Sequence, residues 1–162
     1  MTSPSIHASA VLVGARAVLI RGPAGSGKSR LAYELIEAAR RGSLAFARLV
    51  ADDRVHLEVA NGRLLACPAE KLAGLLEVRG VGIVRLPYEP SAVIGLVVDL
   101  AAADAERLPA QESRRTEIAG IVLPRLAVAA GVDALPAAVA LLTSSDGAAA
   151  WRPGEAILPP PA

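Results

Sequence analysis

The sequence predicts a single α/β domain, and three observations carry that prediction. Residues 22–29 read Gly-Pro-Ala-Gly-Ser-Gly-Lys-Ser, which fits the pattern G-x-x-x-x-G-K-[ST]. A short apolar run of β-type residues, 17–20, comes directly before this pattern. The segment 30–39 follows it, with apolar residues spaced for one face of a helix. A strand, a glycine-rich loop and a helix in this order begin a phosphate-loop α/β fold, and 162 residues suffice for one such domain.

The glycine-rich pattern predicts a site for nucleotide phosphates. Glycines let the backbone turn tightly, so that successive N–H groups point at phosphate oxygens, and the N-terminus of the following helix adds partial positive charge. Lys28 is expected to reach the β- and γ-phosphates, and the Ser29 hydroxyl is expected to bind Mg²⁺. The residues expected to bind the nucleotide are Gly22, Pro23, Ala24, Gly25, Ser26, Gly27, Lys28 and Ser29.

The composition argues against several other classes of protein. The formal net charge is +1 and aromatic residues make up 2% of the chain, so we expect neither nucleic acid nor an anionic membrane as a partner. No apolar stretch approaches the roughly 18 residues needed to span a membrane, and the N-terminus does not resemble a signal peptide. Cys67 is the only cysteine, which excludes an internal disulfide and favours a cytoplasmic location.

Two apolar runs that end in acidic residues compete for the role of metal-binding or catalytic acid. The run 44–51 leads to Asp52 and Asp53, and the run 92–98 ends in Asp99. In an ordinary phosphate-loop NTPase, the acid after a strongly apolar strand is linked to Mg²⁺, so the plain pattern favours Asp99. That assignment predicts a small-molecule kinase or NTPase without a protein partner. Adjacent carboxylates destabilise each other unless a cation shares them, and this favours a functional role for Asp52 and Asp53.

The rest of the chain is expected to form short strands, turns and loops. Hairpins are predicted from 8–13 with 17–20, and from 55–59 with 63–67 around the turn signal Asn61-Gly62. The elements predicted beyond this second hairpin are a short helix at 68–76, a mobile loop at 101–115, a last strand at 116–123 and a short helix at 136–142.

Six short motifs follow one another in a specific order between His7 and Arg125. They are Ile6-His7, Gly22–Ser29, Ala51–Val55, Leu76–Ile83, Glu106–Leu108 and Gly120–Arg125. In order and spacing they resemble the catalytic domain of the HPr kinase/phosphorylase family, enzymes that phosphorylate a serine of the small phosphocarrier HPr. The Ala-Asp-Asp element joined to Glu-x-Arg-Gly-x-Gly-Ile distinguishes this resemblance from one to phosphate-loop proteins in general.

The resemblance implies a fold, cofactors and a partner. The fold is a phosphate-loop catalytic domain with a mixed central sheet and flanking helices, like HPr kinase and PEP carboxykinase. It is expected over residues 1–143, with a Pro/Ala-rich tail over 144–162. ATP and Mg²⁺ are the implied cofactors, and an HPr-like carrier of a phosphotransferase system is the implied substrate. The family forms hexamers, so the resemblance also raises a homo-oligomer as an expectation.

The resemblance also implies individual roles at the phosphate loop. Lys28 keeps its contact with the phosphates, and Ser29 keeps its contact with Mg²⁺. Asp53 is implied as the base that takes the proton from the substrate serine, with Asp52 beside it. Glu77 is implied as the second Mg²⁺ contact. The alternative to an enzyme is a nucleotide-sensing module, which would bind ATP and dock a partner without turnover.

The resemblance extends to a histidine and an arginine outside the phosphate loop, but this chain also differs from the family in two places. His7 matches the family's active-site histidine, and Arg107 matches its active-site arginine in a flexible loop, whereas Asp99 falls where the family is not uniformly acidic. Longer members carry a further domain before the histidine, so this chain resembles the short form of alphaproteobacteria. Where the family has a Gly-Arg segment associated with dephosphorylation, this chain has Asp133-Ala134, so weak reverse phosphorolysis is expected.

Overall fold

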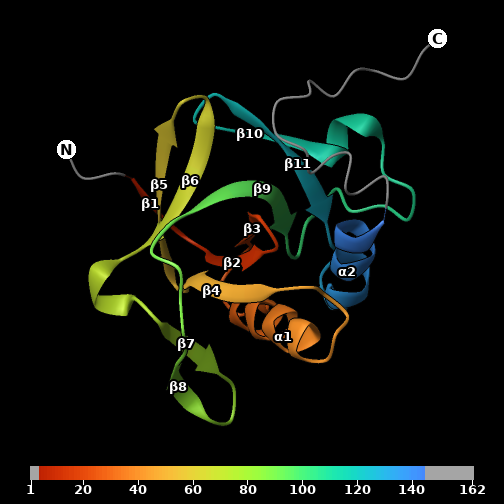
Figure 1. The fold of residues 1–162 in the computed structure, drawn as a ribbon. Helices are drawn as coiled ribbons and strands as arrows, with labels where there is room; N and C mark the ends of the chain where they lie inside the picture. Colours follow the sequence, from red (N-terminus) through yellow and green to blue (C-terminus); the bar gives the residue numbers. More distant parts are fainter. Residues whose placement is uncertain (1–3, 145–162) are drawn as a thin grey trace.

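A mixed sheet of nine strands forms the centre of the structure, a computed structural model that describes residues 4–144 (Figure 1). Its main path runs β1-β5-β6-β9-β3-β2-β4, and β11 joins it beside β9 with β10 outside. β9 is parallel to β3 and β11, and the other neighbours are antiparallel. The strands are β1 (Ser5–His7), β2 (Ser9–Val13), β3 (Arg16–Arg21), β4 (Ala47–Ala51), β5 (Arg54–Ala60), β6 (Arg63–Pro68), β9 (Ala92–Asp99), β10 (Arg115–Ile118) and β11 (Ile121–Ala127).

Two helices and a separate hairpin complete the fold. α1 (Lys28–Arg40) lies against one face of the sheet, and α2 (Leu135–Thr143) packs beside it (Figure 1). β7 (Leu75–Val78) and β8 (Gly82–Arg85) form a two-stranded sheet of their own that packs against α1. The α/β class, the mixed sheet and the flanking helices predicted from the sequence are therefore confirmed. No helix within residues 4–144 is long and apolar enough to cross a bilayer.

Apolar cores lie on both faces of the sheet because its central strands are buried on both sides. On β3, Val18 and Ile20 belong to the core beneath the helices. Ala17 and Leu19 alternate with them and belong to the core closed by β5, β6 and β11. α1 contributes a helical stripe of buried residues to the first core: Leu31, Ala32, Leu35, Ile36 and Ala38. Because β3 is held on both faces, the phosphate loop that follows it starts from a rigid support.

Two tight turns decide how the later strands pair. Asn61 and Gly62 both have positive φ, at 53° and 72°, and they join β5 to β6 as predicted. Ala119 and Gly120 also have positive φ, at 51° and 81°, and they break the segment 116–123 into the hairpin β10–β11. The prediction of one strand there was wrong. An alanine at a position with positive φ gives little sequence signal, because only glycine and asparagine adopt that conformation readily.

The helix predicted over 68–76 was also wrong. Only a single 3₁₀ turn forms there, at Glu70–Leu72. Gly74 has a φ of 77° and stops the turn, and Leu76 then enters β7, where it is fully buried. The leucine spacing that indicated a helix face therefore serves a strand packed against α1. The tail predicted over 144–162 lies, apart from Ser144, outside the described residues.

Candidate active site

The phosphate loop spans residues 22–27, between the end of β3 and the start of α1. Gly25 and Gly27 have φ values of 77° and 99°, which L side chains rarely adopt. A Cβ on Gly22 would lie 2.5 Å from Ser26 Oγ and 3.1 Å from Leu100 Cβ. The loop therefore closes tightly at its first residue, and glycine is required there for space as well as for conformation.

Several polar groups of the loop are disposed as a phosphate site requires. No side chain caps the N-terminus of α1 and no acidic residue lies in its first turn, so no residue of the helix itself offsets the positive charge at this end. Lys28 Nζ donates hydrogen bonds to the carbonyl oxygens of Gly22 at 2.8 Å and Pro23 at 3.1 Å, which holds the ammonium over the loop. Ser26 Oγ is buried and has no hydrogen-bond partner among the described residues. These observations fit an anionic ligand.

Asp52 lies at the centre of a buried hydrogen-bond cluster. Its side chain accepts from Ser29 Oγ, which lies 2.9 Å from each carboxylate oxygen, and from Ser9 Oγ at 2.5 Å. The backbone N–H of Glu77 donates to it at 3.3 Å. Four parts of the fold meet here, because β2 pairs with β4 next to the start of α1 and the β7–β8 hairpin reaches across. Asp52 is only 5% exposed, so its orientation is set by these donors.

Asp53 is the exposed member of the acidic pair and faces His7. His7 Nε2 lies 3.3 Å from Asp53 Oδ1, with both side chains more than half exposed. The φ of Asp53 is 68°, and Arg54 N donates to Asp52 O at 2.8 Å. A hydrogen bond between residues i and i+2 around a positive φ fits the rare, strained form of γ-turn. This turn points adjacent carboxylates in different directions, so that one is buried beside the phosphate loop and the other reaches solvent.

The oxygen atoms near the phosphate loop suit Mg²⁺ that is bound partly by a nucleotide. Among the described residues they are too few to hold a metal ion without such a ligand. Ser29 and Asp52 already lie within hydrogen-bond distance, and Glu77 is tied to Asp52 through its backbone. No group of three or more His, Cys, Asp or Glu side chains within residues 4–144 is placed to hold a metal. Mg²⁺ in nucleotide sites is commonly bound by one or two protein oxygens together with substrate phosphates and water.

Asp99, the acid favoured by the plain strand pattern, is engaged by two arginines. Arg21 Nε and Nη2 donate to its two carboxylate oxygens at 2.7 and 2.8 Å, and Arg125 Nε donates at 2.6 Å. Burial acts to raise the pKa of Asp99, but the hydrogen bonds from these arginines outweigh it, and the pKa lies below its ordinary value. Its charge is already satisfied by protein cations, which leaves little basis for a role in binding Mg²⁺.

Arg107 is an expected site residue with no hydrogen bond or ion pair to the others within residues 4–144, and Glu77 reaches them there only through its backbone N–H. Arg107 lies exposed in the loop after β9, and among residues 4–144 it has no ion pair or hydrogen bond through its side chain. The loop that carries Arg107 begins next to the phosphate loop, because Leu100 N donates to the backbone oxygen of Arg21, the residue before Gly22, at 2.8 Å.

Ser9 is the site residue that the sequence reasoning missed. It is 1% exposed and lies two positions after His7, in a strand whose other residues are apolar. A polar residue inside a short buried strand is the signal that was available, because buried hydroxyls require a hydrogen-bond partner. Only the pairing of β2 with β4 shows that this partner is Asp52.

The sheet, the glycine-rich loop and α1 together define a phosphate-loop α/β domain. A sequence model of one family, the HPr Serine kinase C-terminal domain, matches residues 1–134. The chain therefore belongs to this family.

Individual relatives agree with that assignment. An HPr kinase/phosphorylase of Streptococcus thermophilus is 44% identical over 92 residues, which cover 55% of this chain and 28% of that protein. One from Streptococcus gordonii is 38% identical over 136 residues, covering 76% and 41%. The solved structure of the Hpr(Ser) kinase/phosphatase from Coxiella burnetii shares the fold, with a TM-score of 0.68, 24% identity and coverage of 86% and 88%. This chain spans less than half the length of the curated relatives it matches.

Proposed function

We propose that this protein is an ATP- and Mg²⁺-dependent kinase that phosphorylates a serine of an HPr-like phosphocarrier. The observation that carries the proposal is the divided acidic pair, in which Asp52 is bonded to Ser29 while Asp53 is exposed beside His7. Membership of the family supports the choice of an HPr-like protein as substrate. Phosphocarriers of this kind and ATP meet in the cytoplasm, and we place the protein there.

The residues divide the phosphoryl transfer among themselves. Lys28, the loop N–H groups and the N-terminus of α1 bind the phosphates and hold the γ-phosphoryl group in place. Ser29 and Glu77 are the residues that would hold Mg²⁺, and Asp52 keeps the Ser29 hydroxyl in place; when bound, Mg²⁺ would supply further neutralisation of phosphate charge.

Asp53 acts on the nucleophile. Its carboxylate accepts the proton of the substrate serine as the serine oxygen bonds to the γ-phosphorus, and the bond from that phosphorus to the bridging oxygen of ADP breaks. His7, 3.3 Å away, keeps the exposed carboxylate oriented. Arg107 adds positive charge as the transition state forms, once its loop lies over the phosphates.

The direct test mixes the protein with ATP, Mg²⁺ and a purified HPr-like carrier, and then locates phosphate by mass spectrometry. We expect one phosphoserine on the carrier. Lys28→Ala should abolish the transfer and weaken ATP binding, because it removes the cation over the loop. ATP hydrolysis without a modified carrier would favour the small-molecule kinase or NTPase, and ATP binding without any turnover would favour the sensing module.

A further inference from the structure

A line of four charged side chains connects the phosphate loop to the loop that carries Arg107. Arg21, directly before Gly22, binds Asp99; Asp99 binds Arg125; and Arg125 binds Asp104. Arg21 and Arg125 come from β3 and β11, the two parallel neighbours of β9, and Asp99 ends β9 between them. Asp104 alone lies outside the sheet, in the loop after β9.

Arg125 uses its whole guanidinium group in this line. Nε donates to Asp99 at 2.6 Å, Nη1 and Nη2 donate to the two oxygens of Asp104 at 2.7 and 2.9 Å, and Nη1 also reaches Ser113 O at 3.1 Å. Its side chain is 13% exposed. Its pKa is raised above the ordinary value, first by the hydrogen bonds with Asp104 and also by those with Asp99. A forked, two-point contact fixes geometry as well as charge.

The contacts of Arg125 hold the loop at two separated points. Asp104 lies near its start, and Ser113 lies near its end in the 3₁₀ turn η2 (Gln111–Arg114). Between these points the chain is mostly exposed, and Leu108 is 80% exposed. Arg107 lies in this span, so its position relative to the phosphate loop depends on where the two ends are held.

We propose that Arg125 is a positioning residue that clamps both ends of the 104–113 loop to the sheet and thereby sets where Arg107 can act. The statement about Arg107 rests on the proposed kinase function, whereas the clamp itself does not. Asp99 serves as the shared anchor, because it holds Arg125 and Arg21 together next to the first glycine of the phosphate loop. The acid that an ordinary NTPase offers to Mg²⁺ is here used to fix a loop.

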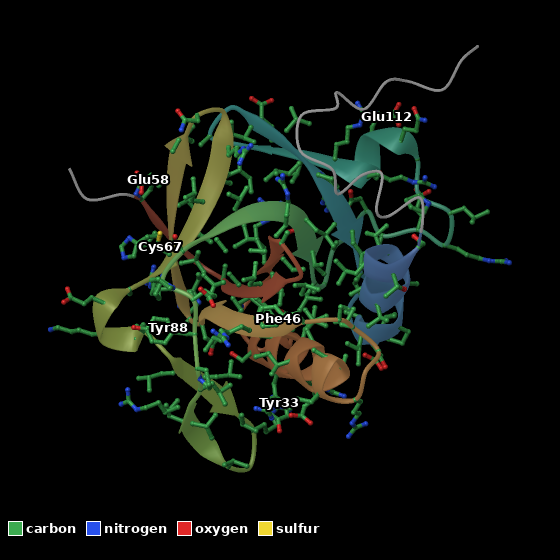
Figure 2. The ribbon with its side chains drawn as sticks, viewed as in Figure 1. Tyr33, Phe46, Glu58, Cys67, Tyr88 and Glu112 are labelled. Atoms are coloured by element: carbon green, nitrogen blue, oxygen red, sulfur yellow. The ribbon has the colours of Figure 1, made fainter. Side chains whose placement is uncertain are left out.

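The test weakens the two-point contact between Arg125 and Asp104, and it uses a matched control. Asp104→Asn keeps the size of the side chain but loses the charge, and Asp104 is half exposed, so the fold should persist. Glu112→Gln is the control, because it removes one negative charge from the same loop. The Glu112 side chain projects outward and has no ion pair among residues 4–144 (Figure 2). Equal melting temperatures would verify that both variants fold.

The first measurement is the rate of native-state cleavage by trypsin after Arg107, followed by mass spectrometry. Cleavage tracks the population of the opened loop when opening is fast. We expect Asp104→Asn to raise this rate about five- to tenfold, because a charged two-point contact is lost, and Glu112→Gln to leave it unchanged. Arg125→Lys keeps the charge without the fork and should also raise it. Wild-type cleavage rates in both Asp104→Asn and Arg125→Lys would overturn the clamp.

The second measurement separates the clamp from the proposed function. In carrier phosphorylation, Asp104→Asn should lower kcat several-fold with KM for ATP unchanged, because the phosphate loop is untouched. Faster trypsin cleavage in Asp104→Asn together with an unchanged kcat would overturn the proposed link to Arg107. If the wild-type protein phosphorylates no carrier, the proposed function fails while the trypsin result still decides the clamp. Transfer by the wild type, with wild-type cleavage rates in both Asp104→Asn and Arg125→Lys, would overturn the clamp and leave the proposed function standing.

Discussion

Asp52 and Asp53 show how adjacent residues of one type come to have separate chemistry. Asp52 is buried and saturated with donors from Ser29, Ser9 and a backbone N–H, so it is suited to hold a metal-binding hydroxyl in place. Asp53 is exposed beside His7, where a substrate hydroxyl has access. The positive φ of Asp53 makes this division possible and carries a backbone cost of roughly 1–3 kcal/mol.

Asp53→Asn should lower kcat for carrier phosphorylation by about 100- to 10,000-fold while ATP still binds. Asparagine tolerates the positive φ and keeps the shape, but its amide does not accept the serine proton. Asp99→Asn should affect kcat far less, since the hydrogen bonds of the Asp99 side chain within residues 4–144 are to Arg21 and Arg125 and none is to the phosphate loop. Rate constants and nucleotide affinities are measured for both variants, and a reversal of the two effects would support the NTPase assignment instead.

Asp99→Asn should instead change stability, and the change should depend on pH. It leaves Arg21 and Arg125 partly buried without their shared counter-charge, which costs about 1–3 kcal/mol. The folded-state pKa of Asp99 is lowered, so its contribution is present above the ordinary value of about 4 and is lost as pH falls through the folded pKa. Denaturant unfolding of both proteins from pH 7 down to pH 3 should show the difference narrowing below about pH 4. A constant difference would contradict this sign.

Ser9→Ala should lower the free energy of unfolding by about 1–3 kcal/mol, because a buried carboxylate loses its donor at 2.5 Å. Asp52 is then free to rotate away from Ser29, so we also expect half-maximal activity to need several-fold more Mg²⁺. Urea unfolding and a Mg²⁺ titration measure the two effects. Ser5→Ala is the control, since Ser5 is exposed in β1, the strand that precedes β2 in the chain; equal behaviour of the two variants would remove Ser9 from the site.

At the scale of elements, the β7–β8 hairpin is the part that closes the site from the side. Its inner residues, Leu76 and Val84 among them, pack in the core beneath α1, and Glu77 N reaches Asp52. Gly74 sets where the hairpin begins. A Cβ there would lie 2.9 Å from Tyr88 Cδ1 and 3.1 Å from Leu86 O, and the φ is 77°.

Gly74→Ala should therefore displace the hairpin and lower the free energy of unfolding by roughly 2–4 kcal/mol, through backbone strain and overpacking together. Gly80→Ala is the matched comparison, because its φ is 85° but a Cβ there meets nothing within 4 Å. It should cost only the backbone part, about 1 kcal/mol. Thermal unfolding and the Mg²⁺ dependence of activity are measured for both variants. Equal losses of stability in Gly74→Ala and Gly80→Ala would mean that backbone strain alone is responsible and that the hairpin is not displaced.

At the scale of the whole molecule, the charge of an acidic residue just before α2 acts on the first turn of α1. Asp133 Oδ1 accepts from Leu135 N at 3.1 Å at the start of α2. The pKa of Arg30 is raised mainly by its hydrogen bond to Glu34, and the charge of Asp133 also contributes. The negative charge of Asp133 therefore acts on Arg30 in the first turn of α1, on the side of the molecule where a free phosphate would bind in a reverse reaction.

We expect phosphorolysis of the phosphorylated carrier to be much slower than the forward transfer, because Asp133 repels phosphate where an arginine would bind it. The assay measures pyrophosphate released from the seryl-phosphorylated carrier at millimolar phosphate. Asp133→Asn should raise that rate a few-fold, since asparagine still accepts the hydrogen bond from Leu135 N but carries no charge. Reverse and forward rates of similar size in the wild type would contradict this account.

Most local structure was predictable because it depends on neighbouring residues. The phosphate loop, α1, both early hairpins and the strand ending at Asp99 follow from glycine positions and apolar spacing. The errors lie where tertiary contacts override local preference, as at Gly74, which packs against Tyr88, and at Ala119, held at positive φ by the β10–β11 pairing.

The sequence by itself determined which residues are candidates for the site, because a phosphate loop requires its glycines, lysine and serine within a few positions of one another. Only the tertiary structure decided how the acids are used. Asp52, Asp53 and Asp99 all come at the ends of apolar runs, and the local pattern favoured Asp99 for a role that its surroundings do not support. Long-range pairing places Ser9 and Ser29 on Asp52, His7 on Asp53, and two arginines on Asp99. The role of a carboxylate depends on the donors and charges around it, and those come from residues distant in the chain.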